Sequence, residues 1–330
     1  MKLLSLLLLV SPLFGQKVTH FTVPVPVGDS LGSVVQGPDN AMWFTLPAYG
    51  GQSGEIGRVT ASGQFTFYDI PSGALTDVFG ITSLGDDLWF TGSTLIVPGV
   101  IYSVSTKGVF REYRLLSNFF PNQLVADPTR GFVWFSASLF PGSESGGGNV
   151  VYYFIASMTQ QGALNLYEQP VGGNYLATAV GPDDNIWMVG TNNGVSSIAR
   201  MTTEGVFTEW PTITPNDGYG GIVAGPDGAL WFTEPSVNQI GRITTSGDMS
   251  EFSLPSSATF PDSITSAGGE LWFVYEISGD QSESVGKIST SGAVTLYPSE
   301  LAFYLAAGPN GTLWSTYALT NQIGFTHLSR

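Results

Sequence analysis

Seven of the eight tryptophans recur along the chain at a nearly constant spacing. Successive intervals are 46, 45, 53, 44, 41 and 42 residues, and each tryptophan follows a turn that contains Gly, Asp or Asn. Self-similarity at such a period restricts the chain to architectures built from repeated supersecondary units. The repeating residues are Trp43, Trp89, Trp134, Trp187, Trp231, Trp272 and Trp314.

The unit around Trp231 shows what is repeated. Short β-prone runs at 221–224, 229–233, 239–244 and 249–254 are separated by turns, the first of which is Gly225-Pro-Asp-Gly228. Glycine in these turns tolerates a positive φ, and proline presets its own φ, so we predict a four-stranded antiparallel meander. Seven such units predict an all-β fold, a seven-bladed β-propeller with four-stranded blades.

The two ends of the chain indicate how the ring closes. The seventh unit reaches Arg330 before its outermost strand, whereas residues 19–26, Thr-His-Phe-Thr-Val-Pro-Val-Pro, match that strand and have no unit of their own before them. We therefore expect this N-terminal strand to complete the last blade, which leaves no open edge in the final sheet.

The first residues resemble a targeting segment. One lysine precedes the apolar run 3–10, which is too short to span a bilayer, and small residues follow near Gly15. We predict a signal peptide at residues 1–15 and a single propeller domain at 16–330, although the run could also form a buried first strand. A secreted or periplasmic protein with no membrane insertion after cleavage is expected.

Charge and cysteine content exclude several functions. The chain has 26 acidic and 11 basic residues, a net charge of −15, and no cysteine. Such a surface repels phosphate backbones and anionic lipids, so we expect no nucleic-acid partner. Disulfides, a thiol nucleophile and cysteine-ligated metals are excluded. We expect a monomer whose partner is a small molecule or a protein bound at the mouth of the central channel.

The first strand of each propeller blade lines the central channel, so the residues that open these strands are site candidates: Gly32, Phe79, Asn122, Leu176, Gly220, Asp262 and Phe303. Polar residues gather in the fifth to seventh units. We predict catalytic roles for Asp262 and Glu276 and metal ligation by Glu234 and Glu276. The predicted ligand-binding residues are Asp217, Tyr219, Asn122, Tyr275 and Tyr317.

The unit Gly-Pro-Asp-Gly-Ala-Leu-Trp-Phe-Thr-Glu at 225–234, followed by Asn238-Gln-Ile-Gly-Arg-Ile-Thr, resembles the repeat of the virginiamycin B lyase family. The resemblance implies a magnesium-assisted elimination that opens a cyclic depsipeptide at its ester bond, with a histidine as base. The family's histidines open inner strands in a Pro-His-Gly motif; Gly220 and Asp262 occupy the matching positions here. Phe260 replaces an expected acid, and Glu276 lies one residue later than the motif predicts.

The chain contains two histidines, His20 and His327, and the repeat places both in outer parts of the seventh unit. Three functions therefore stay open. The first is a binding member of the family without lyase activity. The second is a metal-assisted lyase or lactone hydrolase, which would require Mg²⁺ and would use Glu234, Asp262 and Glu276. The third is a secreted scaffold whose channel is plugged by Phe79, Leu176 and Phe303.

Overall fold

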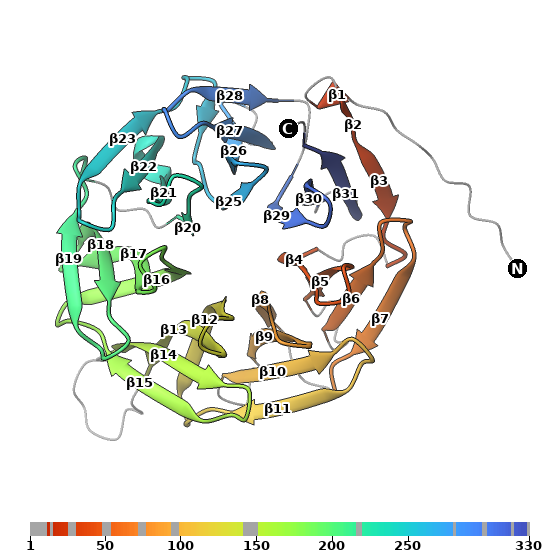
Figure 1. The fold of residues 1–330 in the computed structure, drawn as a ribbon, viewed down its shortest axis with the longest axis horizontal. Coiled ribbons are helices and arrows are strands. Elements are labelled where there is room, and N and C mark those ends of the chain that lie inside the picture. The colour runs from red at the N-terminus through yellow and green to blue at the C-terminus, as the bar shows by residue number, and fades with distance from the viewer. Residues whose placement is uncertain are drawn as a thin grey trace, which may run out of the picture.

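The computed structural model describes residues 12–13, 16–25, 31–47, 54–71, 77–93, 99–140, 151–215, 220–279, 282–298, 302–317 and 320–328. The predicted fold is confirmed: seven antiparallel sheets are arranged as blades around a central channel (Figure 1). None of the helices in the described residues is long and apolar enough to cross a membrane.

Each blade runs outward from its inner strand. Blade one contains β4 (Val34–Gln36), β5 (Met42–Leu46), β6 (Glu55–Val59) and β7 (Phe65–Asp69). Blade two contains β8 (Asp77–Leu84), β9 (Asp87–Ser93), β10 (Val100–Ser105) and β11 (Phe110–Arg114). Blade three contains β12 (Phe119–Asp127), β13 (Phe132–Leu139), β14 (Tyr152–Thr159) and β15 (Leu164–Glu168), and blade four contains β16 (Gly173–Val180), β17 (Ile186–Asn192), β18 (Val195–Met201) and β19 (Phe207–Pro211).

The fifth blade contains β20 (Ile222–Ala224), β21 (Leu230–Glu234), β22 (Gln239–Ile243) and β23 (Met249–Ser253), with a single 3₁₀ turn, η1 (Pro235–Val237), after β21; blade six contains β24 (Ala258–Thr259), β25 (Ile264–Ala267), β26 (Glu270–Ile277), β27 (Glu283–Ile288) and β28 (Val294–Tyr297); blade seven contains β29 (Tyr304–Gly308), β30 (Thr312–Tyr317), β31 (Gln322–His327) and β3 (Thr19–Thr22). A separate two-stranded pair joins β1 (Pro12–Leu13) and β2 (Gln16–Lys17).

Two features of this arrangement bear on the sequence predictions. The N-terminal strand β3 pairs antiparallel with β31 and completes blade seven, as expected (Figure 1). Blade six differs from the predicted four strands, because its inner edge is divided into β24 and β25, which both pair with β26. The segment 260–263 that separates them lies at the channel, so this break shapes the mouth.

The repeated tryptophans pack within and between the blades. Trp43, Trp187 and Trp231 are fully buried. Each stacks on an aromatic side chain of its own outer strand, at centroid distances of 5.4 Å for Trp43 with Tyr68 and 5.4 Å for Trp187 with Trp210. Trp210, the tryptophan outside the repeat, therefore fills the aromatic position that tyrosine or phenylalanine occupies in other blades.

The aromatic residue of each outer strand also contacts the next blade. Tyr68 in blade one packs against Gly108 of blade two, where an added Cβ would lie 2.5 Å from the Tyr68 ring. The Tyr68 hydroxyl also donates to the carbonyl of Thr106 at 3.3 Å. The same contact recurs across the ring closure, because the Phe21 ring lies against Gly63 of blade one. Phe21 therefore completes both blade seven and its interface with blade one.

Candidate functional site at the channel mouth

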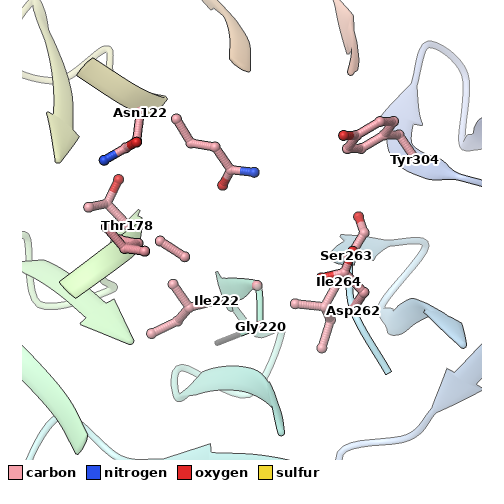
Figure 2. A pocket seen from close by; sticks show the side chains of 12 residues that line it. Asn122, Thr178, Gly220, Ile222, Asp262, Ser263, Ile264 and Tyr304 are labelled. Carbon is pink, nitrogen blue, oxygen red and sulfur yellow. The ribbon is translucent and has the colours of Figure 1, made fainter. Parts of the chain in front are cut away.

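Two cavities lie at the end of the channel where the inner strands begin. One has a volume of about 340 Å³ and is lined by blades three to seven; the other, of about 370 Å³, is lined by blades one, two, three and seven. Asn122, Gln123 and Tyr304 line both. Leu176 and Phe303 are part of these linings and do not close them. Figure 2 shows the first cavity, with Asn122 and Thr178 facing Tyr304 across it.

Irregular inner strands supply the lining. In blade three the register shifts between Pro121 and Leu124, so one extra residue is inserted opposite β13. A β-bulge of this kind bends its strand and re-aims side chains, which explains how the neighbours Asn122 and Gln123 both reach the channel. The break between β24 and β25 does the same in blade six, where Asp262 and Ser263 both line the cavity.

A hydroxyl on the second strand of one blade fixes the inner strand of the next blade. The Thr233 hydroxyl of β21 donates to the carbonyl of Asp262 at 2.6 Å and accepts from the Gly221 amide at 2.8 Å. Ser136 makes the corresponding bond to the carbonyl of Leu176 at 2.6 Å. We call these contacts hydroxyl bridges; they set the position of residues that line the mouth.

Three carboxylates gather at the mouth end of blade six. Asp262 is accessible to solvent in the channel. The protein around the channel nevertheless desolvates its carboxyl, and this desolvation raises the pKa of Asp262 above the usual range. Glu276 and Glu283 are directly paired at the facing ends of β26 and β27. Burial, followed by the charges of Asp262 and Glu276, raises the pKa of Glu283 to about 7. The pKa of the Tyr304 hydroxyl is also raised, first by burial and then by the charges of Asp262 and Glu283.

The predicted acidic pair Glu234 and Glu276 is not brought together. Residues alternate between the two faces of a strand. Glu234 lies on the face of β21 whose residues Leu230 and Phe232 pack against blade four. Glu276 lies on the face of β26 whose residues Trp272 and Val274 pack toward blade seven. The one-residue offset of Glu276 in the repeat therefore turns its side chain to the opposite interface.

Two predicted ligand-binding tyrosines also lie away from the cavity. Tyr275 is 1% exposed and belongs to the apolar cluster between blades five and six, together with Trp231. Tyr317 is buried at the end of β30, where its ring makes an edge contact with His20 at 4.9 Å. Of the residues predicted to have a catalytic, ligand-binding or metal role, Asn122 and Asp262 line the first cavity. Of the other candidates at strand openings, Leu176 and Gly220 also line the first cavity, and Gly32 and Phe303 line the second.

Several residues of the mouth were not predicted. Gln123, Thr178, Ser263 and Tyr304 line the cavity, and Glu283 lies close enough to Asp262 for their charges to interact. Tyr304 directly follows the predicted opening residue Phe303, and Glu283 opens the strand that pairs with the end of β26. An antiparallel pairing of Glu276 with Glu283 could therefore have indicated the latter.

The donor atoms do not fit the magnesium ion that the family resemblance implies. Among the described residues there is no group of three or more His, Cys, Asp or Glu side chains that could hold a metal ion. Glu234 and Glu276 face different blade interfaces, and Asp262 is the one carboxylate in the lining of the first cavity. We therefore derive no chemical step through a metal ion.

Some sequence predictions fall outside the described part of the chain. The structure does not describe Asp217 or Tyr219. Of the predicted signal peptide it describes Pro12 and Leu13, and the side chain of Phe79 lies outside the described part as well. His20 and His327 are described, and they lie on β3 and β31 in the outer half of blade seven, as predicted.

The inner strands define a seven-bladed β-propeller with a cavity-lined mouth, and comparison with known proteins agrees with this fold. The sequence profile of the virginiamycin B lyase family matches residues 149–329, more than half of the chain. The chain belongs to this family.

Individual relatives show the extent of the similarity. Virginiamycin B lyase of Bordetella parapertussis is 42% identical over 59 residues, which is 18% of this chain and 20% of the relative; the matched segment thus spans about a fifth of that protein. The selenomethionine-substituted virginiamycin B lyase of Staphylococcus aureus superimposes with a TM-score of 0.75 and 27% identity, over 95% of this chain and 99% of the other. A catalytically inactive histidine-to-alanine variant of the Staphylococcus aureus enzyme, solved with quinupristin, gives a TM-score of 0.74 at 26% identity, over 95% and 99% of the chains.

Proposed function

We propose that this protein is a binding member of the virginiamycin B lyase family, which holds a small molecule at the channel mouth and does not catalyse the family's elimination. The cavity supports binding because hydrogen-bonding side chains converge on a space of about 340 Å³, a size suited to a small ligand. No histidine is among the residues that line either described cavity. A propeller without a histidine in the lining of its mouth can still recognise a ligand there.

The observation that supports this proposal best is the packing at Gly220. An added Cβ at this position would lie 1.9 Å from the Thr233 hydroxyl and 2.4 Å from the Thr233 carbonyl oxygen. A histidine side chain therefore has no room where the family resemblance implies one. The space is taken by the hydroxyl bridge from Thr233 to Asp262, so the mouth is organised around a different set of contacts.

The second motif position carries an acid where the family resemblance implies a histidine. Asp262 carries a carboxylate, whose ordinary pKa lies well below that of an imidazole, and burial raises the pKa of Asp262 without any basic partner among the described residues. A carboxylate with a raised pKa can serve as a general base, so Asp262 by itself does not decide between binding and elimination, and the packing at Gly220 carries the proposal. Of the other functions, a lyase with Glu234 and Glu276 as metal ligands has less support because these side chains face different interfaces.

The same proposal includes export and a monomeric state. The apolar run after Lys2 supports cleavage near Gly15 and a secreted or periplasmic location. Amino-terminal sequencing of protein recovered outside the cytoplasm tests the cleavage, and an intact Met1 would contradict it.

Lyase activity is tested with quinupristin and MgCl₂, using the Staphylococcus aureus virginiamycin B lyase as positive control. Liquid chromatography separates the cyclic compound from a linear product formed by elimination, and mass spectrometry detects a hydrolysis product by its added water. We expect the cyclic compound to persist with this protein. A linear product that forms with the unmodified chain and not with an Asp262→Asn variant would overturn the proposal in favour of an enzyme.

A further inference from the structure

Charge is unevenly distributed between the two ends of the blades. Among the described residues, six of the seven ion pairs lie at the end opposite the mouth, at the turns or strand ends that join the first and second strands. In blade five, for example, Asp227 accepts from Arg242 at 2.7 Å and from the indole nitrogen of Trp231 at 3.0 Å. Six acids at this end are thus paired with five arginines and one lysine.

The carboxylates beside the mouth cavities have no such compensation. None of the ion pairs of the described residues includes Asp262, Glu276 or Glu283, and no lysine, arginine or histidine is among the residues that line the two cavities. Burial first, and then repulsion by the charges of Asp262 and Glu276, raises the pKa of Glu283. A cleft lined by one sign of charge with protein walls focuses the field and concentrates ligands of opposite charge.

The lining of the first cavity indicates what kind of cation fits. Its volume of about 340 Å³ greatly exceeds that of a bare metal ion, and a hard divalent cation needs six or more oxygen ligands. The side-chain oxygen ligands present are one carboxylate, Asp262, the amide oxygens of Asn122 and Gln123, and the hydroxyls of Thr178, Ser263 and Tyr304. Apolar walls, which a hydrated metal ion would not use, are provided by Leu176, Ile222 and Ile264.

The arrangement of these groups suits a molecule with two ends. Figure 2 shows Asp262 and Ser263 beside Ile264, with Ile222 across from them beyond Gly220 and the Tyr304 ring reaching into the same space. The carboxylate can accept from an ammonium group while the aliphatic side chains pack against hydrocarbon. The face of a tyrosine ring also attracts cations.

We infer that the channel mouth selects a small organic cation, an amine that carries its positive charge beside a hydrocarbon group, with Asp262 as the residue that recognises the charge. This inference rests on the proposed binding function and names its ligand class. It predicts discrimination by charge among molecules of the same shape.

Three probes of similar size test it by isothermal titration: 2-phenylethylamine as cation, 2-phenylethanol as neutral analogue and phenylacetate as anion. We expect the cation to bind at pH 8 at least tenfold more tightly than the alcohol, and phenylacetate to bind least. Binding of the amine should weaken as NaCl is raised, because salt screens the charge of a water-accessible site. Magnesium and calcium chlorides, titrated separately, should give no saturable heat.

Variants identify the residue responsible. Asp262→Asn keeps the size of the side chain and removes its charge, so the advantage of the amine over the alcohol should fall to about twofold or less. Asp86→Asn removes the same charge from an exposed turn at the opposite end of blade two and should leave the advantage unchanged. Circular dichroism confirms that both variants are folded.

The results separate the two levels of the proposal. Equal binding of amine and alcohol, or an advantage that survives in Asp262→Asn, overturns the inferred ligand class and leaves a binding pocket. Saturable metal binding that Asp262→Asn abolishes also overturns it. If none of the three probes binds, the inference is contradicted. The proposal that the protein binds without catalysing elimination is tested separately, by measuring whether quinupristin is converted to a linear product.

Discussion

Glu283 shows how a single residue can record the electrostatics of the mouth. Its carboxyl is half-buried at the start of β27, faces Glu276 across the strand pair, and lies within the field of Asp262; Tyr304 approaches from blade seven. No described base opposes these charges. An acid held in such surroundings at neutral pH costs folding free energy, and natural proteins retain costs of this kind mainly where a site needs them.

This cost gives a prediction with a definite sign. The pKa of Glu283 rises from an ordinary 4.5 to about 7 on folding, so the folded protein binds more protons than the unfolded chain between these values. The free energy of unfolding contributed by this group therefore falls as the pH rises from about 4.5 to about 7, and the penalty is complete above pH 7. At pH 8 the free energy of unfolding of Glu283→Gln should exceed that of the natural protein by about 1–2 kcal/mol, after allowance for solvent screening.

Urea denaturation from pH 4 to pH 8 measures this difference, which should vanish at the acidic end. Comparison of variant and natural protein at each pH removes the contributions of other groups, including His20, whose pKa is lowered by burial. Glu168→Gln, at an exposed end of β15, is the matched control and should change stability by less than about 0.5 kcal/mol at every pH. A Glu283→Gln variant that is no more stable than the natural protein at pH 8 would contradict the role assigned to burial.

At the level of strands, the hydroxyl bridges link the position of one inner strand to the second strand of the preceding blade. Thr233 serves both Gly221 and Asp262, and Thr91 donates to the carbonyl of Asn122 at 2.8 Å. Both Asp262 and Asn122 line the cavity. The bridges thus hold the inner strands, which are broken or bulged at the mouth, in a fixed position relative to the regular second strands.

Replacing Thr233 by valine tests this link with little change of side-chain volume. The Asp262 carbonyl would lose the hydroxyl donor, and the Gly221 amide would keep only its long bond to Asp262, so we expect a loss of about 1–3 kcal/mol in the free energy of unfolding. Thr66→Val, on the exposed face of β7, is the control and should be nearly neutral. Equal stability of the two variants in chemical denaturation would show that the bridge contributes nothing.

The same strands show how far sequence reasoning reaches. Blade number, strand order and ring closure follow from local signals, because the tryptophan spacing and the unmatched strand at Thr19 are visible without tertiary information. The site is less accessible, because it depends on breaks in that regularity. Asn122 and Asp262 were found from their positions at strand openings, but the face of Glu276 depends on a one-residue register that the repeat does not reveal.

At the level of the whole molecule, the propeller depends on one non-covalent closure. Blades one to six are each continuous in the chain, whereas blade seven joins residues near the two ends through the four register pairs of β3 with β31. Phe21 is buried there, at 6.3 Å from Trp314 and 6.1 Å from Phe325 between ring centroids, and it also contacts Gly63 of blade one. Its ring therefore belongs to two interfaces at once.

Phe21→Ala should accordingly release β3 before the other blades unfold. Removal of a buried phenylalanine costs about 3–5 kcal/mol, and β3 is an edge strand of four residues that pairs with β31 alone. Native-state hydrogen exchange should show the amides of β3 opening at a lower free energy than those of β30. Phe252→Ala removes the equivalent ring in blade five, where both ends of the strand are held by the chain, so it should destabilise its own blade and leave β3 protected. If β3 in Phe21→Ala stayed protected to the same free energy as β30, the ring would have to be closed by contacts other than this side chain.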